Sequence, residues 1–207
     1  MYSGDETINL GDGKPVHSVL DFWRWAHNTL DDRFERGVFA EYLVYTAVSD
    51  RAGKRYDGPY DLIGCNGLKI EVKSVAVSYK DDKLGNDTKS TFNISPVQIW
   101  NGWTRTFSKE KIRPSDIYVF AVWTDAGNRD SIIDSNSWEF YVMATSFVNE
   151  TFGTDSKSVS LSRIKKHRTP CCYSDLYKAV YKEYCEHSCL TFSNPDDPET
   201  KNTSGVD

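Results

Sequence analysis

The chain has 207 residues, of which 39% are hydrophobic, 27% charged and 14% aromatic, and its formal net charge is −5. This length fits one domain with a substantial core, and the acidic balance argues against a protein that coats nucleic acid through bulk positive charge. No apolar run approaches the roughly 18 residues that a bilayer crossing needs, and the polar start is not a signal peptide. We therefore expect a cytoplasmic protein without membrane contact.

The first part of the chain predicts two helices. Ser18 and Asp21 have the spacing of a capping box at the start of the first one. The second covers about residues 32–50 and carries one stripe at helical spacing, formed by Phe34, Val38, Glu41, Tyr45 and Val48. The glutamate in this stripe either snorkels at its edge or is aimed inward towards a polar site.

Residues 60–77 predict a β-hairpin with strands at about 60–65 and 68–77. Asn66-Gly67 between two runs of strand formers is a strong signal for such a turn. After a polar loop, residues 90–94 predict a strand. The remaining expected elements are a short helix at 95–103 that starts at Ser95, strands at 116–123 and 138–144, a helix at 174–188 and a disordered tail at 193–207. This order predicts a single α/β domain over residues 1–192, with a mixed sheet flanked by helices.

Three ionisable residues interrupt the apolar runs of the hairpin, namely Asp61, Glu71 and Lys73. Glu71 and Lys73 are two positions apart, so their side chains leave the same face of one strand. Buried charges cost free energy unless they are paired or bind an ion. The hairpin is therefore either a solvent-facing edge with an ion pair or part of a polar site.

Taken together, these positions resemble the PD-(D/E)XK, or restriction-endonuclease-like, nuclease superfamily. The matching residues are Glu41 in "GVFAEYLVYTAV", Asp61 in "GPYDLIG" and the pair Glu71 and Lys73 in "LKIEVKS". The match covers roughly residues 33–123 as helix, hairpin, helix and strand, and it implies a nuclease-like core at about 33–144. The family core has a further strand before the aspartate, for which the segment "RAGKRYDG" leaves little room.

The resemblance implies an endonuclease that hydrolyses phosphodiester bonds in DNA, in restriction, defence or repair. Oxygen-only ligands indicate Mg²⁺ or Mn²⁺ rather than zinc. Asp61 and Glu71 would be the main metal ligands, and the backbone carbonyl of Val72 would add another. Lys73 would hold the attacking water and offset charge, while Glu41 would support a metal-bound water or a second ion.

Phosphate contacts are less defined by the sequence. The candidates are Lys69, Lys80, Lys83, Lys89, Gln98, Arg105, Lys109, Lys111, Arg113 and the basic cluster at 163–168. The alternative is that each lysine or arginine is simply a solvated surface charge and that Gln98 belongs to a capping box. The five cysteines are expected to be free thiols, since Cys171, Cys172, Cys185, His187 and Cys189 match no standard zinc pattern.

A shared metal site also predicts the register of the hairpin. A regular two-residue type I′ turn would place Asp61 on the face away from Glu71. A three-residue loop instead closes Gly64 onto Leu68 and places Asp61 opposite Glu71. We therefore expect a positive φ at Gly67 and a bulge there, built as a type I turn followed by one left-handed residue.

Alternatives remain open at this point. The chain could be a catalytically silent nucleic-acid-binding or assembly module with a nuclease fold, or an ordinary interaction protein whose Glu-x-Lys is accidental. RNA is the alternative substrate to DNA, and a double-strand cut would call for a homodimer.

Overall fold

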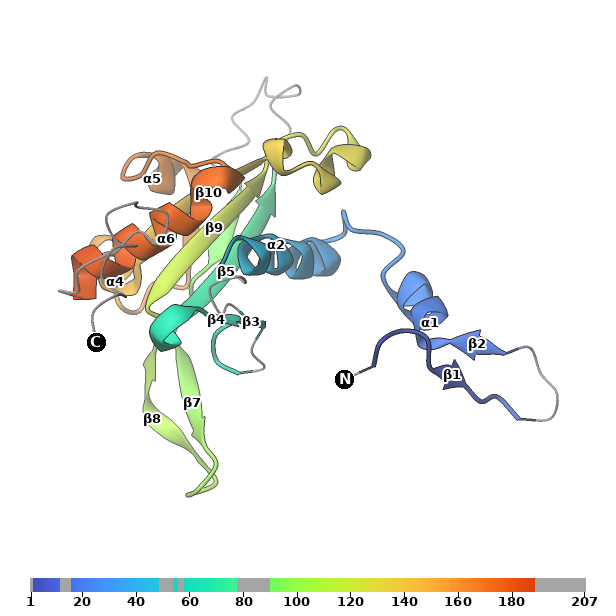
Figure 1. The fold of residues 1–207 in the computed structure, drawn as a ribbon. Coiled ribbons are helices and arrows are strands. Elements are labelled where there is room, and N and C mark those ends of the chain that lie inside the picture. The colour runs from blue at the N-terminus through green and yellow to red at the C-terminus, as the bar shows by residue number, and fades with distance from the viewer. Residues whose placement is uncertain (1, 12–15, 49–53, 56–57, 78–89, 189–207) are drawn as a thin grey trace, which may run out of the picture.

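The computed structural model describes residues 2–11, 16–48, 54–55, 58–77 and 90–188, and Figure 1 shows their arrangement. A five-stranded mixed sheet lies at the centre, and helices cover both of its faces. The predicted α/β class is therefore confirmed. The polar loop at 79–89 and the tail at 193–207 lie outside the described residues.

The central sheet contains one parallel pair and three antiparallel pairs. In spatial order its strands are β10 (Trp138–Ala144), β9 (Ile117–Trp123), β5 (Lys69–Ala76), β4 (Leu62–Ile63) and β3 (Lys54–Arg55). The parallel neighbours are β5 and β9. The strand that precedes the aspartate is thus present as β3, with two residues only.

The sheet separates two hydrophobic cores. The first core lies under α2 (Arg33–Val48) and α6 (Tyr173–Ser188). The second lies under α4 (Thr145–Phe152), α5 (Leu161–Lys165) and a small sheet formed by β6 (Thr91–Asn93) and β11 (Ser158–Ser160). All seven residues of β9 are buried because both faces of this strand are covered, which explains its continuous apolar sequence.

On α2, the core-facing stripe differs from the predicted one. Its buried residues are Ala40, Leu43, Val44 and Val48. Phe34, which the predicted stripe included, is 71% exposed. The prediction was wrong because two neighbouring stripes of this helix are both largely apolar, and only packing against the sheet selects one of them.

The β4–β5 pair has the predicted register. Leu62 pairs with Ile70, and the Asp61 N–H donates to the Ile70 carbonyl at 3.0 Å. The same register places Asp61 opposite Glu71, as the shared site requires.

The turn has the expected positive φ at Gly67 and closes Gly64 onto Leu68 as expected, but its bulge lies at a different position. Both Asn66 (φ 57°) and Gly67 (φ 76°) are left-handed, which is typical of a type I′ turn. The Leu68 N–H donates to the Cys65 carbonyl at 3.1 Å, while the Gly64 N–H donates to the Leu68 carbonyl at 2.7 Å. Two residues thus face one, so the bulge lies before the turn and restores the register.

Residues 97–112 form a β-hairpin instead of the short helix predicted at 95–103. β7 (Val97–Asn101) pairs antiparallel with β8 (Thr106–Ile112), and the hairpin projects from the body in Figure 1. The Asn101 side chain accepts hydrogen bonds from the N–H groups of Trp103 (2.9 Å) and Thr104 (3.2 Å) at the tip. Pairing with a later segment therefore overrides the helix-start signals at Ser95.

The remaining elements include the first helix as predicted. α1 (Val19–Ala26) follows β1 (Thr7–Ile8) and β2 (His17–Ser18), and Ser18 and Asp21 form its capping box. Two short 3₁₀ helices, Arg129–Ile133 and Ser135–Ser137, connect β9 to β10. In the described part of the chain, no helix combines the length and apolar character that a membrane crossing requires.

Candidate functional site

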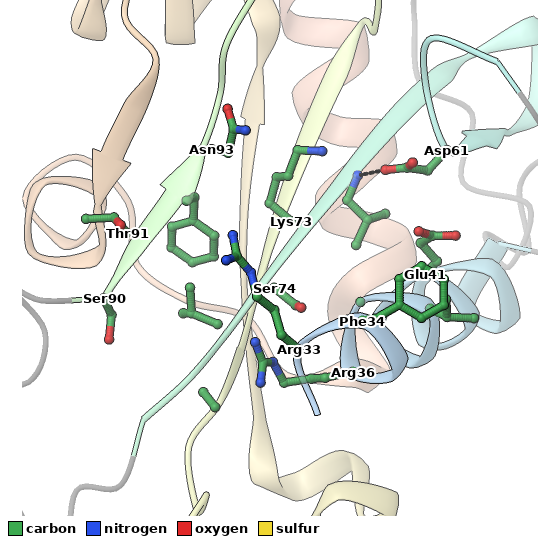
Figure 2. A pocket seen from close by; sticks show the side chains of 16 residues that line it. Arg33, Phe34, Arg36, Glu41, Asp61, Lys73, Ser74, Ser90, Thr91 and Asn93 are labelled. Atoms are coloured by element: carbon green, nitrogen blue, oxygen red, sulfur yellow. Dashed lines mark hydrogen bonds between the residues drawn. The ribbon is translucent and has the colours of Figure 1, made fainter. Parts of the chain in front are cut away.

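A cavity of about 780 Å³ opens along one edge of β5 (Figure 2). β4 pairs only with the first two residues of β5, so the described residues provide no paired strand for the rest of this edge. The N-terminal half of α2 forms one wall, and residues 90–93, which include β6, form the other. An open strand edge gives the cavity both side chains and backbone groups.

Asp61 is held at the end of the β4–β5 ladder. Its Oδ2 accepts a hydrogen bond of 2.8 Å from the Val72 N–H, drawn as the dashed line in Figure 2. The N–H and C=O of one strand residue point to the same side of the strand. The Val72 carbonyl therefore points to the same edge as the Asp61 carboxylate.

Glu71 and Lys73 form an ion pair, in which the Glu71 side chain is 14% exposed. They start the row on β5 that continues with Val75 and Val77 in the second core. Burial, followed by the negative charge of Asp61, raises the pKa of Glu71 to about 7, and Glu41 adds to this rise while Lys73 opposes it. A solvent-facing ion pair, the simpler interpretation, does not fit this burial.

Glu41 reaches the same cavity from α2. It lies beside the core-facing stripe, lines the cavity together with Asp61 and Lys73, and is on the same side of the cavity as Asp61 in Figure 2. Its charge acts on Glu71, as the pKa of Glu71 indicates. The structure thus brings all four motif positions to one region.

Two arginines that the sequence analysis did not single out line another part of the cavity. Arg33 and Arg36 lie in the first turns of α2 and extend between this helix and β5 in Figure 2. The Arg36 Nε is buried and has no hydrogen-bond partner among the described residues. Burial and the nearby charge of Arg33 lower the pKa of Arg36. An unpaired donor beside a like charge favours an anionic ligand.

The predicted phosphate contacts lie mostly elsewhere. The described residues that line the cavity do not include Lys69, Gln98 or Arg105. The Lys69 ammonium lies 5.9 Å from the centre of the Tyr60 ring. Gln98 and Arg105 belong to the β7–β8 hairpin together with Lys109 and Lys111. Lys80, Lys83 and Lys89 lie outside the described residues.

Arg113 is a structural residue, so its prediction as a substrate contact was wrong. It is 7% exposed, and its guanidinium donates to the carbonyls of Ile94 (2.7 Å), Gly153 (3.1 Å) and Ser156 (2.7 Å), as well as to the Asn149 side chain. These four bonds fix the base of the β7–β8 hairpin to the body.

Part of the basic cluster at 163–168 is also structural. Arg163 lies 5.0 Å from the Phe152 ring centre, and Arg168 lies 3.9 Å from that of Phe147. Arg168 also forms an ion pair of 2.8 Å with Glu183. These contacts give Arg163 and Arg168 partners within the protein.

In the described part of the chain, the cysteines are free thiols, and Cys189 lies outside it. No group of three or more His, Cys, Asp and Glu side chains among the described residues is arranged to hold a metal ion. Mg²⁺ needs only one or two protein carboxylates, because it keeps several waters and accepts phosphate oxygens. Asp61, Glu71 and the Val72 carbonyl are a donor set of this kind, and the negative charges of Asp61 and Glu41 that help raise the pKa of Glu71 fit a cation between these carboxylates.

The sequence matches no protein-family model and no curated protein.

Proposed function

We propose that the chain is a Mg²⁺- or Mn²⁺-dependent endonuclease that hydrolyses phosphodiester bonds in DNA. The observation that carries the proposal is the gathering of Glu41, Asp61 and Glu71 around Lys73 at an open strand edge, where crowding and burial raise the pKa of Glu71 to about 7. A lysine and three carboxylates gathered at a partly buried strand edge are costly for a site without a ligand.

A restriction-endonuclease-like core belongs to the same proposal. The order α2, β3, β4, β5 and β9, with β5 parallel to β9, supports it. The β7–β8 hairpin stands where a second helix was expected between β5 and β9, which is a departure from the family pattern.

The residues would divide the chemistry as follows. Asp61, Glu71 and the Val72 carbonyl would hold the metal ion, which would polarise the phosphate and lower the pKa of a bound water. Lys73 would position the attacking water and offset the negative charge that develops on the phosphoryl oxygens. Glu41 would accept hydrogen bonds from ordered water at the same site.

The arginine part of the cavity supports an anionic polymer as substrate. Arg33 and Arg36 line the cavity together with Lys73 but lie away from the carboxylates of Glu41 and Asp61 (Figure 2). Guanidinium groups bind phosphates through directed hydrogen bonds. A strand that places one phosphate at Lys73 would bring a neighbouring phosphate to the arginines.

The test is cleavage of supercoiled plasmid with Mg²⁺, Mn²⁺ or EDTA by the wild type, Asp61→Asn and Lys73→Ala. We expect metal-dependent cleavage by the wild type and a loss of at least about 100-fold in both variants, because each removes a group that acts on the reacting phosphate. Lys182→Ala and Glu186→Gln are the matched controls, since this exposed lysine and glutamate form an ion pair on α6 and neither residue lines the cavity.

The outcomes separate the candidate functions. Cleavage that survives in either site variant would contradict the assignment. DNA binding by the wild type without cleavage under any metal condition would favour the catalytically silent binding module instead. Cleavage of RNA but not of DNA would make RNA the substrate and leave the assignment of the site residues unchanged.

A further inference from the structure

The β7–β8 hairpin is the most exposed element of the central part of the chain. None of its residues from Val97 to Ile112 is buried, and its tip residue Trp103 is 98% exposed. Four further large apolar residues lie open on it, since Val97 is 40%, Trp100 53%, Phe107 61% and Ile112 48% exposed. Exposed aromatic residues on a projecting element indicate an interaction surface.

The hairpin carries a preformed aromatic pair. Trp100 lies opposite Phe107, and their ring centres are 5.0 Å apart in an edge-to-face contact. Beyond a register shift, Gln98 lies opposite Lys111, and the Gln98 amide donates to the Ser108 carbonyl at 2.8 Å. The pair therefore offers an ordered aromatic surface near the tip.

The charge of the hairpin is opposite to that of the chain. It contains three cations, Arg105, Lys109 and Lys111, and a single carboxylate, Glu110. The whole chain has 25 Lys and Arg against 30 Asp and Glu. A local excess of positive charge favours an anionic partner for this hairpin. It disfavours pairing with the same hairpin of a second chain, because the two would repel each other.

The base of the hairpin is fixed close to the candidate site. Arg113 bonds the segment after β8 to the Ile94 carbonyl before β7 at 2.7 Å. Asp116, which follows, exchanges two hydrogen bonds with Lys69 at the start of β5, at 2.8 and 2.9 Å. The hairpin thus leaves the body at the end of β5 that carries Glu71, as Figure 1 also shows.

We propose that the β7–β8 hairpin is an arm that binds duplex DNA in a groove next to the candidate cleavage site. A two-stranded β-ribbon fits the major groove, and cationic side chains along it reach the flanking phosphates. Seven residues of β8 span roughly 20 Å, so the tip reaches about six base pairs from the base of the arm. Trp103 provides a flat apolar group at the tip for contact with bases.

This inference rests on the proposed function for the identity of the polymer, and its test does not depend on cleavage. Binding of a fluorescent duplex is measured by anisotropy in EDTA with the full chain. Trp103→Ala is expected to raise Kd about 10-fold. Arg105→Ala with Lys111→Ala is expected to lower the slope of log Kd against log salt by about two.

Two matched controls test whether any exposed residue of the same type matters. Trp25→Ala replaces a tryptophan on α1 that is 75% exposed, and Arg24→Ala replaces an arginine whose side chain is 72% exposed. Both should bind the duplex as the wild type does. The melting temperatures of the hairpin variants should stay unchanged, because none of the replaced side chains is buried.

Two outcomes would contradict the arm. If both hairpin variants bind DNA with the Kd of the wild type, the arm is contradicted, even where the wild type cleaves plasmid. A change of oligomeric state in Trp103→Ala by sedimentation, with unchanged DNA binding, would make the hairpin a protein contact instead. If the wild type does not cleave DNA but its binding depends on the hairpin, the arm is supported and the nuclease proposal is contradicted.

Discussion

Glu71 carries the most perturbed carboxyl group at the candidate site, and its pKa links the site to stability. Burial and its acidic neighbours raise this pKa from 4.5 to about 7. Between these values the folded protein holds a proton that the unfolded chain has lost, so stability falls as pH rises through this window. The loss is complete above about pH 7.

Glu71→Gln should therefore be more stable than the wild type above pH 7 and equally stable below about pH 4.5. The gain is at most roughly 3 kcal/mol, from about 1.4 kcal/mol for each pKa unit, and the loss of the Lys73 ion pair reduces it. Thermal melting in EDTA from pH 4 to pH 8 measures it, with Glu186→Gln as the exposed control. Parallel curves for Glu71→Gln and the wild type would contradict the raised pKa.

Arg36 is expected to help substrate binding without stabilising the folded protein. Arg36→Met keeps the apolar stem and removes a guanidinium whose buried Nε lacks a partner among the described residues. Its Nη1 donates only a long hydrogen bond of 3.5 Å to the Asp31 carbonyl, so the melting temperature should not fall. KM for DNA should rise about 10-fold with little change in kcat, because a ground-state phosphate contact is lost. Arg24→Met on α1 is the control, and an unchanged KM would remove Arg36 from the substrate path.

At the scale of elements, Arg113 decides whether the hairpin has a fixed base. Arg113→Met removes four hydrogen bonds and leaves the Ile94, Gly153 and Ser156 carbonyls without this donor. We expect a loss of about 3 kcal/mol in the free energy of unfolding, measured by urea denaturation. Arg129→Met, whose side chain is 69% exposed, should cost less than about 1 kcal/mol. Similar losses in both variants would contradict the anchoring role.

The two hairpins illustrate what the sequence could predict. The β4–β5 register was predictable because Asn66-Gly67 marks the turn and because Asp61 must face Glu71 for the chemistry. The β7–β8 hairpin has the same signal in Asn101-Gly102, but the helix-start residues at Ser95 and Pro96 compete with it. Local signals could not decide between them, since strand pairing depends on residues up to 15 positions apart.

The candidate site was predictable only where its residues interrupt an apolar pattern. Asp61, Glu71 and Lys73 stand out among strand formers for this reason. Arg33 and Arg36 lie in the mixed first turns of α2, where charged residues are ordinary, and only the position of β5 beside the helix brings them into a cavity. Their role therefore follows from tertiary structure.

For the whole molecule, the position of the site follows from how the two cores meet. The first core holds Ile70 and Val72, and the second begins on β5 at Val75. Glu71 and Lys73 occupy the two positions of that second row before the apolar residues begin. A polar site at the end of a core is partly desolvated yet open to a large ligand, which suits both a perturbed carboxyl group and a polymeric substrate.

The open edge of β5 also bears on aggregation. The N–H and C=O groups of every second strand residue point to the same edge, so those of Ser74 and Ala76 point the same way as those of Val72, into the cavity. The described residues provide no partner strand for them there. An unpaired edge of this kind is a template for intermolecular β-sheet growth unless charge or bulk blocks it. Arg33 and Arg36 line the cavity at this edge, so we expect the cations that would attract a phosphate backbone also to oppose edge-to-edge pairing of two chains.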